Sequence, residues 1–146
     1  MLICPICGEP LTRETPPAAS ACYRCPNRHS FDVARQGYVN LLARPTRLLA
    51  DTLAMLRARR AFLARGHYAP LAAAVNDLVW AGVSSASQTD PAVPPAVLDV
   101  GCGEGYYIGR LADALAHSGD WRCFGLDLAR DAARLAATAS PQVTLF

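Results

Sequence analysis

The stretch Val97-Leu98-Asp99-Val100-Gly101-Cys102-Gly103-Glu104-Gly105-Tyr106-Tyr107 decides the fold of this chain. Its first part, from Ala96 to Val100, is a short apolar run with β-branched residues, which is typical of a parallel strand covered on both faces. Three alternating glycines follow, and they allow a sharp turn and let a ligand approach backbone that carries no Cβ atoms. The stretch therefore predicts a buried strand, a glycine-rich turn and a helix that begins near Glu104.

A second strand, expected at 121–126, delivers Asp127 to a position 22 residues after Gly105. An acidic side chain at the end of the second strand is where nucleotide-binding α/β folds hold a ribose diol. The dinucleotide fingerprint G-x-G-x-x-G would need a third glycine where this chain has Tyr106. The spacing G-x-G-x-G, preceded by Asp99, instead resembles motif I of the Rossmann-like S-adenosylmethionine-dependent methyltransferases. The alternative is an ordinary strand-turn-helix whose glycines serve packing alone.

The residues after the glycine-rich turn continue the alternation of helices and strands. We expect helices at 104–117 and 129–139 and the start of a third strand at 142–146. Such alternation predicts an α/β fold with a parallel sheet. Because three strands cannot cover both faces of a doubly wound sheet or complete its ligand crevice, we interpret the chain as a fragment or truncated product.

Spaced cysteines mark the N-terminal part. Cys4 and Cys7 form one C-x2-C pair, and Cys22, Cys25 and His29 offer three candidates for two further ligands. Either Cys22 with Cys25, or Cys25 with His29, would complete a tetrahedral zinc site. A site with four protein ligands is structural, and so short a stretch needs the metal because its own core is small.

The overall composition is that of one domain, or of a small module joined to part of a larger one. Hydrophobic residues make up 52% of the 146 residues and charged residues 18%, which argues against global disorder. Residues 1–68 carry ten arginines and four acidic residues (+6), whereas residues 69–146 carry four arginines and eight acidic residues (−4). The asymmetry favours an RNA-facing module joined to a cofactor domain, or it is chance variation between solvated faces.

No signal peptide is visible, and no apolar run approaches the roughly 20 residues of a membrane span. We therefore expect a cytoplasmic protein without a membrane partner. In a reducing cytosol, spaced cysteines indicate metal binding rather than disulfides. Cys102 and Cys123 fall outside the N-terminal group and are expected to be small buried apolar residues.

A basic helix is expected from an N-cap at Asp51 to a C-cap at Gly66. Its arginines serve either solubility or phosphate contact. Its apolar stripe comprises Leu49, Leu53, Leu56 and Leu63.

A second helix is expected over 70–81, because proline is favoured at the first helical position. Residues 82–95, rich in serine and proline, have the composition of a linker. The predicted buried stripe of this helix comprises Leu71, Ala74, Val75, Leu78 and Val79.

Several segments together resemble one family, the 23S ribosomal RNA (guanine-N1)-methyltransferases (the RlmA family). The resemblance covers essentially the whole chain in order, apart from 82–95. It rests on Cys-Pro-x-Cys at 4–7, Cys-Pro-Asn-Arg-His at 25–29, Phe-Asp at 31–32, Gly-Tyr-Val-Asn-Leu-Leu at 37–42, Arg-Ala-Phe-Leu at 60–63, Gly-His-Tyr at 66–68, the motif at 98–107 and Gly-Leu-Asp at 125–127.

The resemblance implies a zinc-binding domain at 1–35, a connecting segment with the basic helix at 36–69, and the N-terminal part of a Rossmann-like methyltransferase domain at 70–146. It implies S-adenosylmethionine and structural zinc as cofactors, and methylation of guanine N1 in a hairpin of large-subunit ribosomal RNA. Family members are similar in forming homodimers. The zinc ligands that the resemblance implies are Cys4, Cys7, Cys25 and His29.

The same resemblance gives roles to the glycine-rich stretch. Gly101, Gly103 and Gly105 would face the methionine part of S-adenosylmethionine, and Asp99 would support its amino end. Asp127 would bind the ribose hydroxyls. Further contacts to the cofactor are expected from Tyr106 and Tyr107. The groups that hold the base should come from later strands, so no general base is named and the 146-residue chain alone is expected to lack turnover.

Two other functions remain open from the sequence. One is a methyltransferase that acts on a small molecule or a protein and carries a zinc ribbon. The other is a non-catalytic fragment that binds zinc and RNA and holds half of a cofactor site. Transfer of a labelled methyl group to RNA or to protein would separate the first of these from ribosomal RNA methylation.

Overall fold

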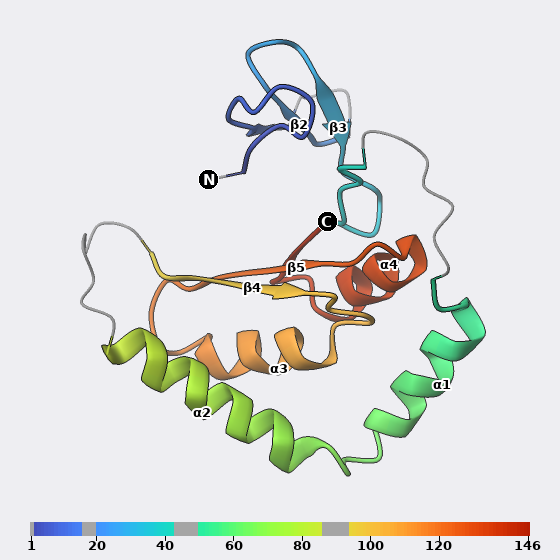
Figure 1. The fold of residues 1–146 in the computed structure, drawn as a ribbon, viewed down its shortest axis with the longest axis vertical. Helices are drawn as coiled ribbons and strands as arrows, with labels where there is room; N and C mark the ends of the chain where they lie inside the picture. The colour runs from blue at the N-terminus through green and yellow to red at the C-terminus, as the bar shows by residue number, and fades with distance from the viewer. Residues whose placement is uncertain (1, 16–19, 43–49, 86–93) are drawn as a thin grey trace.

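The computed structural model describes residues 2–15, 20–42, 50–85 and 94–146. Figure 1 shows a small N-terminal module beside an α/β part, with two further helices running along the α/β part. Leu49, the predicted loop around Pro45 and most of the predicted linker lie outside the described residues.

The N-terminal module is a three-stranded antiparallel sheet in the order β1-β2-β3. Its strands are β1 (Thr12–Glu14), β2 (Cys22–Arg24) and β3 (Ser30–Asp32). With only three residues in each strand, the module buries a small core, which consists of Cys4, Leu11, Cys25, Phe31 and Val39. So small a core supports the expectation that a metal helps to hold this module together.

The α/β part confirms the predicted alternation and the parallel sheet. Its elements are β4 (Ala96–Val100), α3 (Tyr106–Leu115), β5 (Arg122–Leu126), α4 (Arg130–Ala139) and β6 (Thr144–Leu145). The sheet order is β4-β5-β6 and both pairings are parallel. Cys123 is buried with apolar residues of α3 and α4, so both helices contribute to one core.

The prediction that β4 is covered on both faces is wrong. Leu98 is 53% exposed and Val100 is 70% exposed. Both side chains point to the same side of the strand because they are two residues apart. β4 is also the edge strand of the sheet among the described residues, and Leu98 lines an open hollow with residues of α2 and α3 instead of being packed beneath them.

Helix α1 (Leu53–Leu63) begins one residue later than predicted. Its N-cap is Thr52 rather than Asp51, since the Thr52 hydroxyl accepts a hydrogen bond from the Met55 N–H at 3.3 Å. The C-cap is Ala64, and Gly66 follows with a φ of +83° in the turn toward the next helix. Of the predicted stripe, Leu56 and Leu63 are buried.

Helix α2 (Ala69–Ser85) includes residues 82–85, which the sequence had assigned to the linker. Of its predicted buried stripe, Val79 is partly buried and packs against the core of the α/β part, and the other predicted residues are not buried. Among the residues of α2 whose burial is described, 69–82, the buried one is Ala72 at 1% exposure, whereas Leu71, Val75 and Leu78 are exposed. The physical reason is that α2 packs on α3, as Figure 1 also shows, and the apolar face beside that contact has no cover among the described elements.

Residues Tyr38 and Val39 join the N-terminal module to the α/β sheet. The Val39 N–H donates to the Leu145 carbonyl at 2.9 Å, and Tyr38 forms a parallel bridge with Leu145 of β6. The Tyr38 hydroxyl accepts from Arg130 Nε at 3.0 Å. The segment after the module therefore pairs with the outer edge of the parallel sheet. Among the described residues, no helix combines the length and apolar character needed to cross a membrane.

Candidate functional site

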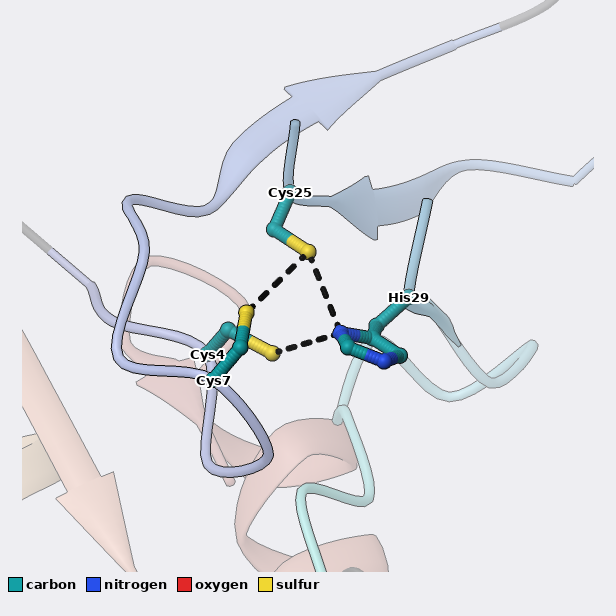
Figure 2. A group of neighbouring side chains, drawn as sticks. All are labelled: Cys4, Cys7, Cys25 and His29. Carbon is teal, nitrogen blue, oxygen red and sulfur yellow. Dashed lines mark hydrogen bonds between the residues drawn. The ribbon is translucent and has the colours of Figure 1, made fainter. Parts of the chain in front are cut away.

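Four candidate metal ligands meet at one end of the N-terminal module. The Sγ atoms of Cys4, Cys7 and Cys25 and a ring nitrogen of His29 all lie within 4.8 Å of one another. Figure 2 shows the three sulfurs and the imidazole pointing toward a common centre. Two turns supply the ligands, one after β2 and one near the start of the chain.

The spacing of these donors fits a zinc ion. The Cys7 and Cys25 sulfurs are 3.7 Å apart, and His29 Nδ1 lies 3.4 Å from the Cys25 sulfur and 3.6 Å from the Cys4 sulfur. Zinc bonds of about 2.3 Å to sulfur and about 2.0 Å to nitrogen place tetrahedral ligands about 3.8 Å apart for two sulfurs and about 3.5 Å apart for sulfur and nitrogen. Three sulfurs and one imidazole nitrogen are therefore arranged as a closed tetrahedral site requires.

Local backbone bonds set these positions. The Gly8 N–H donates to the Cys4 carbonyl at 2.9 Å, and Gly8 itself has a φ of +75°. In the second turn, the Cys25 N–H donates to the His29 carbonyl at 3.1 Å, and the Arg28 N–H donates to the Cys25 carbonyl at 2.9 Å. Arg28 adopts a φ of +65°, a conformation that is uncommon for a residue other than glycine.

The two turns affect their thiols differently. A hydrogen bond from the Glu9 backbone lowers the pKa of the Cys7 thiol to about 6. Burial raises the pKa of the Cys25 thiol. Since the thiolate is the form that binds metal, Cys7 is the more readily available ligand of this pair.

Cys22 lies outside this group of four donors. It begins β2, opposite Asp32, and its side chain is buried. The structure thus brings together the set of ligands that the family resemblance implies, and it does not bring Cys22 within the same 4.8 Å.

The glycine-rich turn connects β4 to α3 and has the sharp backbone geometry that its glycines predict. Gly101, Gly103 and Gly105 have φ values of +79°, +57° and +86°. Gly105 is the N-cap of α3, and a Cβ there would lie 2.9 Å from the Cβ of Ala136 in α4. The turn therefore requires glycine at this position for its backbone angle and also for the close approach of a neighbouring helix.

Asp127 holds this turn from the end of β5. One carboxylate oxygen accepts from the Gly103 N–H at 2.9 Å and the other accepts from the Ala129 N–H at 2.7 Å. The side chain is partly exposed, so each oxygen retains capacity for a further donor. Asp127 can thus orient the turn and still bind hydroxyl groups of a ligand.

Asp99 ends up near Asp127, as parallel neighbouring strands require. Burial raises the pKa of the Asp99 carboxyl, and the negative charge of Asp127 raises it further. Two acidic groups at the carboxyl ends of adjacent parallel strands form the expected position for a ligand in an open α/β sheet.

An apolar hollow of about 210 Å³ adjoins Asp127. One wall comes from the end of β5 and the following loop, including Leu128, and Phe146 also lines it. The other wall is the segment from Tyr38 to Leu42, which follows the N-terminal module. Sequence reasoning did not assign this segment to the site, although the distinctive run Gly-Tyr-Val-Asn-Leu-Leu was a signal that could have pointed to it.

Arg60 is a second residue that the sequence did not assign to the site. Its Nε lies 3.3 Å from a carboxylate oxygen of Glu104, which is only 4% exposed, inside the glycine-rich turn. Its NH2 group donates to the Glu104 carbonyl at 3.1 Å and to the Leu135 carbonyl at 3.0 Å. One guanidinium therefore joins α1, the turn and α4, a contact between residues 44 positions apart that no local pattern indicates.

The rings of the two tyrosines after the turn, Tyr106 and Tyr107, contact each other edge to face with their centroids 5.1 Å apart. Tyr107 lines a hollow with Asp99 and with apolar residues of α2, among them Val75. The Tyr106 ring lies 5.5 Å from the Arg110 guanidinium, and its buried hydroxyl has no hydrogen-bond partner among the described residues. Tyr107 therefore lines the same hollow as Asp99, and the Tyr106 ring packs against Tyr107.

Comparison with known proteins agrees with this arrangement. Residues 2–45 match the family model Zn_ribbon_RlmA, described as the N-terminal part of RlmA. The chain is 41% identical over 143 residues to a 23S rRNA (guanine(748)-N(1))-methyltransferase of Streptomyces fradiae, covering 98% of this chain and 46% of that protein. It is 39% identical over 149 aligned positions to a Micromonospora griseorubida protein that is named for 23S rRNA (guanine-N1) methyl transfer, covering 97% of this chain and 48% of that protein.

The match to the curated relatives runs through the zinc ribbon, the connecting helices and the glycine-rich turn alike, and the chain spans about half of their length. Residues 2–45 match a zinc ribbon of the RlmA type, and over almost its whole length the chain is similar to proteins named as 23S rRNA (guanine-N1)-methyltransferases.

Proposed function

We propose that this chain serves the S-adenosylmethionine-dependent methylation of guanine N1 in a hairpin of large-subunit ribosomal RNA. The observation that carries the proposal is the glycine-rich turn bound to the Asp127 carboxylate, in a chain that is about 40% identical to relatives named for that reaction. Neither the turn nor the names would be sufficient alone, because glycine-rich turns of this kind serve many nucleotide ligands.

Zinc is proposed to be bound by Cys4, Cys7, Cys25 and His29. The distances between their donor atoms, described above, support this set. All four tetrahedral positions would be filled by the protein, so no position would remain for a water or a substrate. The proposed role is therefore structural, and the ion would hold the two turns of the N-terminal module together.

The proposed cofactor site lies at the carboxyl ends of β4 and β5. Gly101, Gly103 and Gly105 would allow the methionine part to approach the backbone, and Asp99 would accept from its amino group. Asp127 would accept from the ribose hydroxyls, and the adjoining apolar hollow would receive the adenine ring. Tyr107 beside Asp99 would close the methionine end, and the resemblance extends the same proposal to Tyr106.

S-adenosylmethionine supplies an activated methyl group, so the protein mainly has to align donor and acceptor. Guanine N1 carries a proton and pairs within a duplex, so the base has to be unstacked before transfer. The residues of the glycine-rich turn and the two acidic groups would bind and orient the cofactor, and none of them is proposed as the base that removes the N1 proton.

Turnover is proposed to need further polypeptide beside β4. Leu98 and Val100 are exposed although they belong to a parallel strand, and parallel strands are stable when both faces are covered. A segment that covers them would also complete the crevice next to Asp99. Whether that segment comes from the same polypeptide or from the second subunit of the proposed homodimer decides how the full protein is assembled.

A primer-extension assay tests the proposal. A large-subunit ribosomal RNA transcript is incubated with S-adenosylmethionine and either this chain or a version that is longer at the C-terminus by the corresponding part of a relative. N1-methylguanine blocks pairing, so it stops reverse transcriptase at one guanine. We expect a cofactor-dependent stop with the longer version and none with this chain alone. Labelled methyl transfer to protein instead of RNA, or no transfer from either version, would refute the proposed substrate.

A further inference from the structure

Helix α1 and the turn after it carry a cluster of exposed aromatic rings. Phe62 is 45% exposed and Tyr68 is 40% exposed, and their ring centroids are 5.7 Å apart in an edge-to-face arrangement. The His67 ring, which is also exposed, has its centroid 6.0 Å from that of Phe62. Rings that contact one another and remain open to solvent form a ready surface for a planar ligand.

The segment that carries this cluster contains arginines and no acidic residue. From Thr52 to Asn76 the sequence contains four arginines and no aspartate or glutamate. Arg59 lies one turn before Phe62 on the same side of α1, and Arg57 and Arg65 are exposed as well. Among the described residues, none of these three arginines forms an ion pair. These exposed guanidinium groups therefore give the helix that carries the cluster a positive charge that no described acidic side chain neutralises.

The opposite side of α1 contacts the proposed cofactor turn. Arg60, two residues before Phe62, points inward to Glu104. Residues two apart on a helix face roughly opposite directions, and a helix with its side chains is about 10 Å across. A ligand on Phe62 and Tyr68 would consequently lie about one helix diameter from the glycine-rich turn.

We propose that the surface formed by Arg59, Phe62, His67 and Tyr68 binds an unpaired stretch of RNA. Bases stack on exposed aromatic rings only when they are free of their own helix, and arginines neutralise the phosphates between them. The charge of the surface, with no acidic residue from 52 to 76, is complementary to a polyanion. The inference rests on the proposed function for the class of ligand, and it adds the place where RNA next to the target base is held.

Fluorescence anisotropy tests the proposed RNA surface. It measures the binding of a fluorescein-labelled 15-nucleotide single-stranded RNA to the zinc-loaded chain. We expect Phe62→Ala and Tyr68→Ala each to weaken binding about tenfold, because stacking on one ring contributes that order of affinity. Phe62→Tyr and Tyr68→Phe keep a ring and should bind within about twofold of the wild type, which separates stacking from a folding defect. Arg59→Gln should lower the slope of log affinity against log salt by about 0.7.

Trp80 provides the matched control, since it is 46% exposed on α2 and lies outside the basic region. Trp80→Ala should leave RNA affinity unchanged. Three results would each overturn the proposal. They are an equal loss of RNA affinity in Trp80→Ala and Phe62→Ala, an affinity for a fully paired duplex equal to that for the single strand, and no binding of RNA by the wild-type chain. If Phe62→Ala or Tyr68→Ala changes the oligomeric state of the chain but not its affinity for RNA, the surface is a protein contact instead. Failure of methyl transfer would not affect these binding results, so the two proposals fail separately.

Discussion

The Arg60 guanidinium binds the Glu104 carboxylate at 3.3 Å and the Glu104 carbonyl at 3.1 Å, and so joins a connecting helix to the glycine-rich turn. Glu104 is almost fully buried, whereas the Arg60 side chain is 36% exposed. Removing the arginine would leave a buried carboxylate without its counter-charge. The geometry of the turn therefore depends on a residue that lies far from it in the sequence.

We expect Arg60→Ala to lower the free energy of unfolding by about 2 kcal/mol, which allows for the partial exposure of the arginine. Arg57→Ala, an exposed arginine of the same helix, should change stability by less than about 0.5 kcal/mol. Urea unfolding of both variants and of Glu104→Gln measures this. If the double variant Arg60→Ala, Glu104→Gln is as unstable as the sum of the single losses, the two side chains are not coupled.

The zinc site yields a prediction with an internal control. Cys25→Ser should reduce bound zinc from one ion per chain to none under dialysis, because it removes one of four ligands. Cys22→Ser, which changes a buried cysteine of the same module, should retain one ion. Metal content by atomic emission spectroscopy decides between them. If Cys22→Ser loses zinc and Cys25→Ser retains it, then Cys22 and not Cys25 is the zinc ligand.

Gly105 should tolerate alanine poorly. Its φ of +86° is strained for alanine, and the new Cβ would lie 2.9 Å from the Cβ of Ala136. Gly119 has a φ of +111° with open space around it, so it isolates the backbone effect. We expect Gly119→Ala to destabilise by about 1 kcal/mol and Gly105→Ala by about 3 kcal/mol. Thermal unfolding compares them, and equal effects would show that the contact with α4 is not tight.

Asp127 should protect two backbone amides from exchange with solvent. It accepts from the N–H groups of Gly103 and Ala129, and hydrogen bonds to a charged acceptor are worth about 1.5–3 kcal/mol. Asp127→Ala should therefore accelerate exchange of these amides by about tenfold or more, measured by nuclear magnetic resonance. Asp131→Ala serves as the control, since it removes a carboxylate in the first turn of α4 whose side chain is 45% exposed. Unchanged protection in Asp127→Ala would mean that the turn holds its shape without the carboxylate.

Alkaline pH should destabilise the chain through Cys102. Burial, reinforced by the charges of Asp99 and Asp127, raises the pKa of this thiol to about 12. Because the folded-state pKa is raised, the stabilisation is fully present below the unfolded pKa of about 8.5 and is lost as pH rises toward 12. The difference in urea midpoint between the wild type and Cys102→Ala should accordingly change between pH 8 and pH 11. A difference that stays constant over this range would contradict the raised pKa.

Local patterns were sufficient for much of the site. The apolar run before alternating glycines predicted β4 and its turn, and the spacing to Asp127 placed an acidic group at the end of β5 next to it. These predictions hold because the geometry of one strand, one turn and the parallel neighbour follows from residues within about 30 positions. The choice between Cys22 and His29 was open from spacing alone, since both satisfy the sequence rules for zinc.

Tertiary structure decided the rest, because burial and long-range contacts depend on what packs against an element. The apolar residues of α2 matched a helical stripe, yet Leu71 and Leu78 are exposed, since the helix contacts α3 and packs Val79 against the core that α3 helps to form. No local sequence pattern distinguishes Arg60 from the neighbouring arginines, and only the fold brings it to Glu104. The sequence by itself determined which backbone can turn and which side chains can bind, whereas only the folded chain determined which of them meet, because packing between distant segments has no local signal.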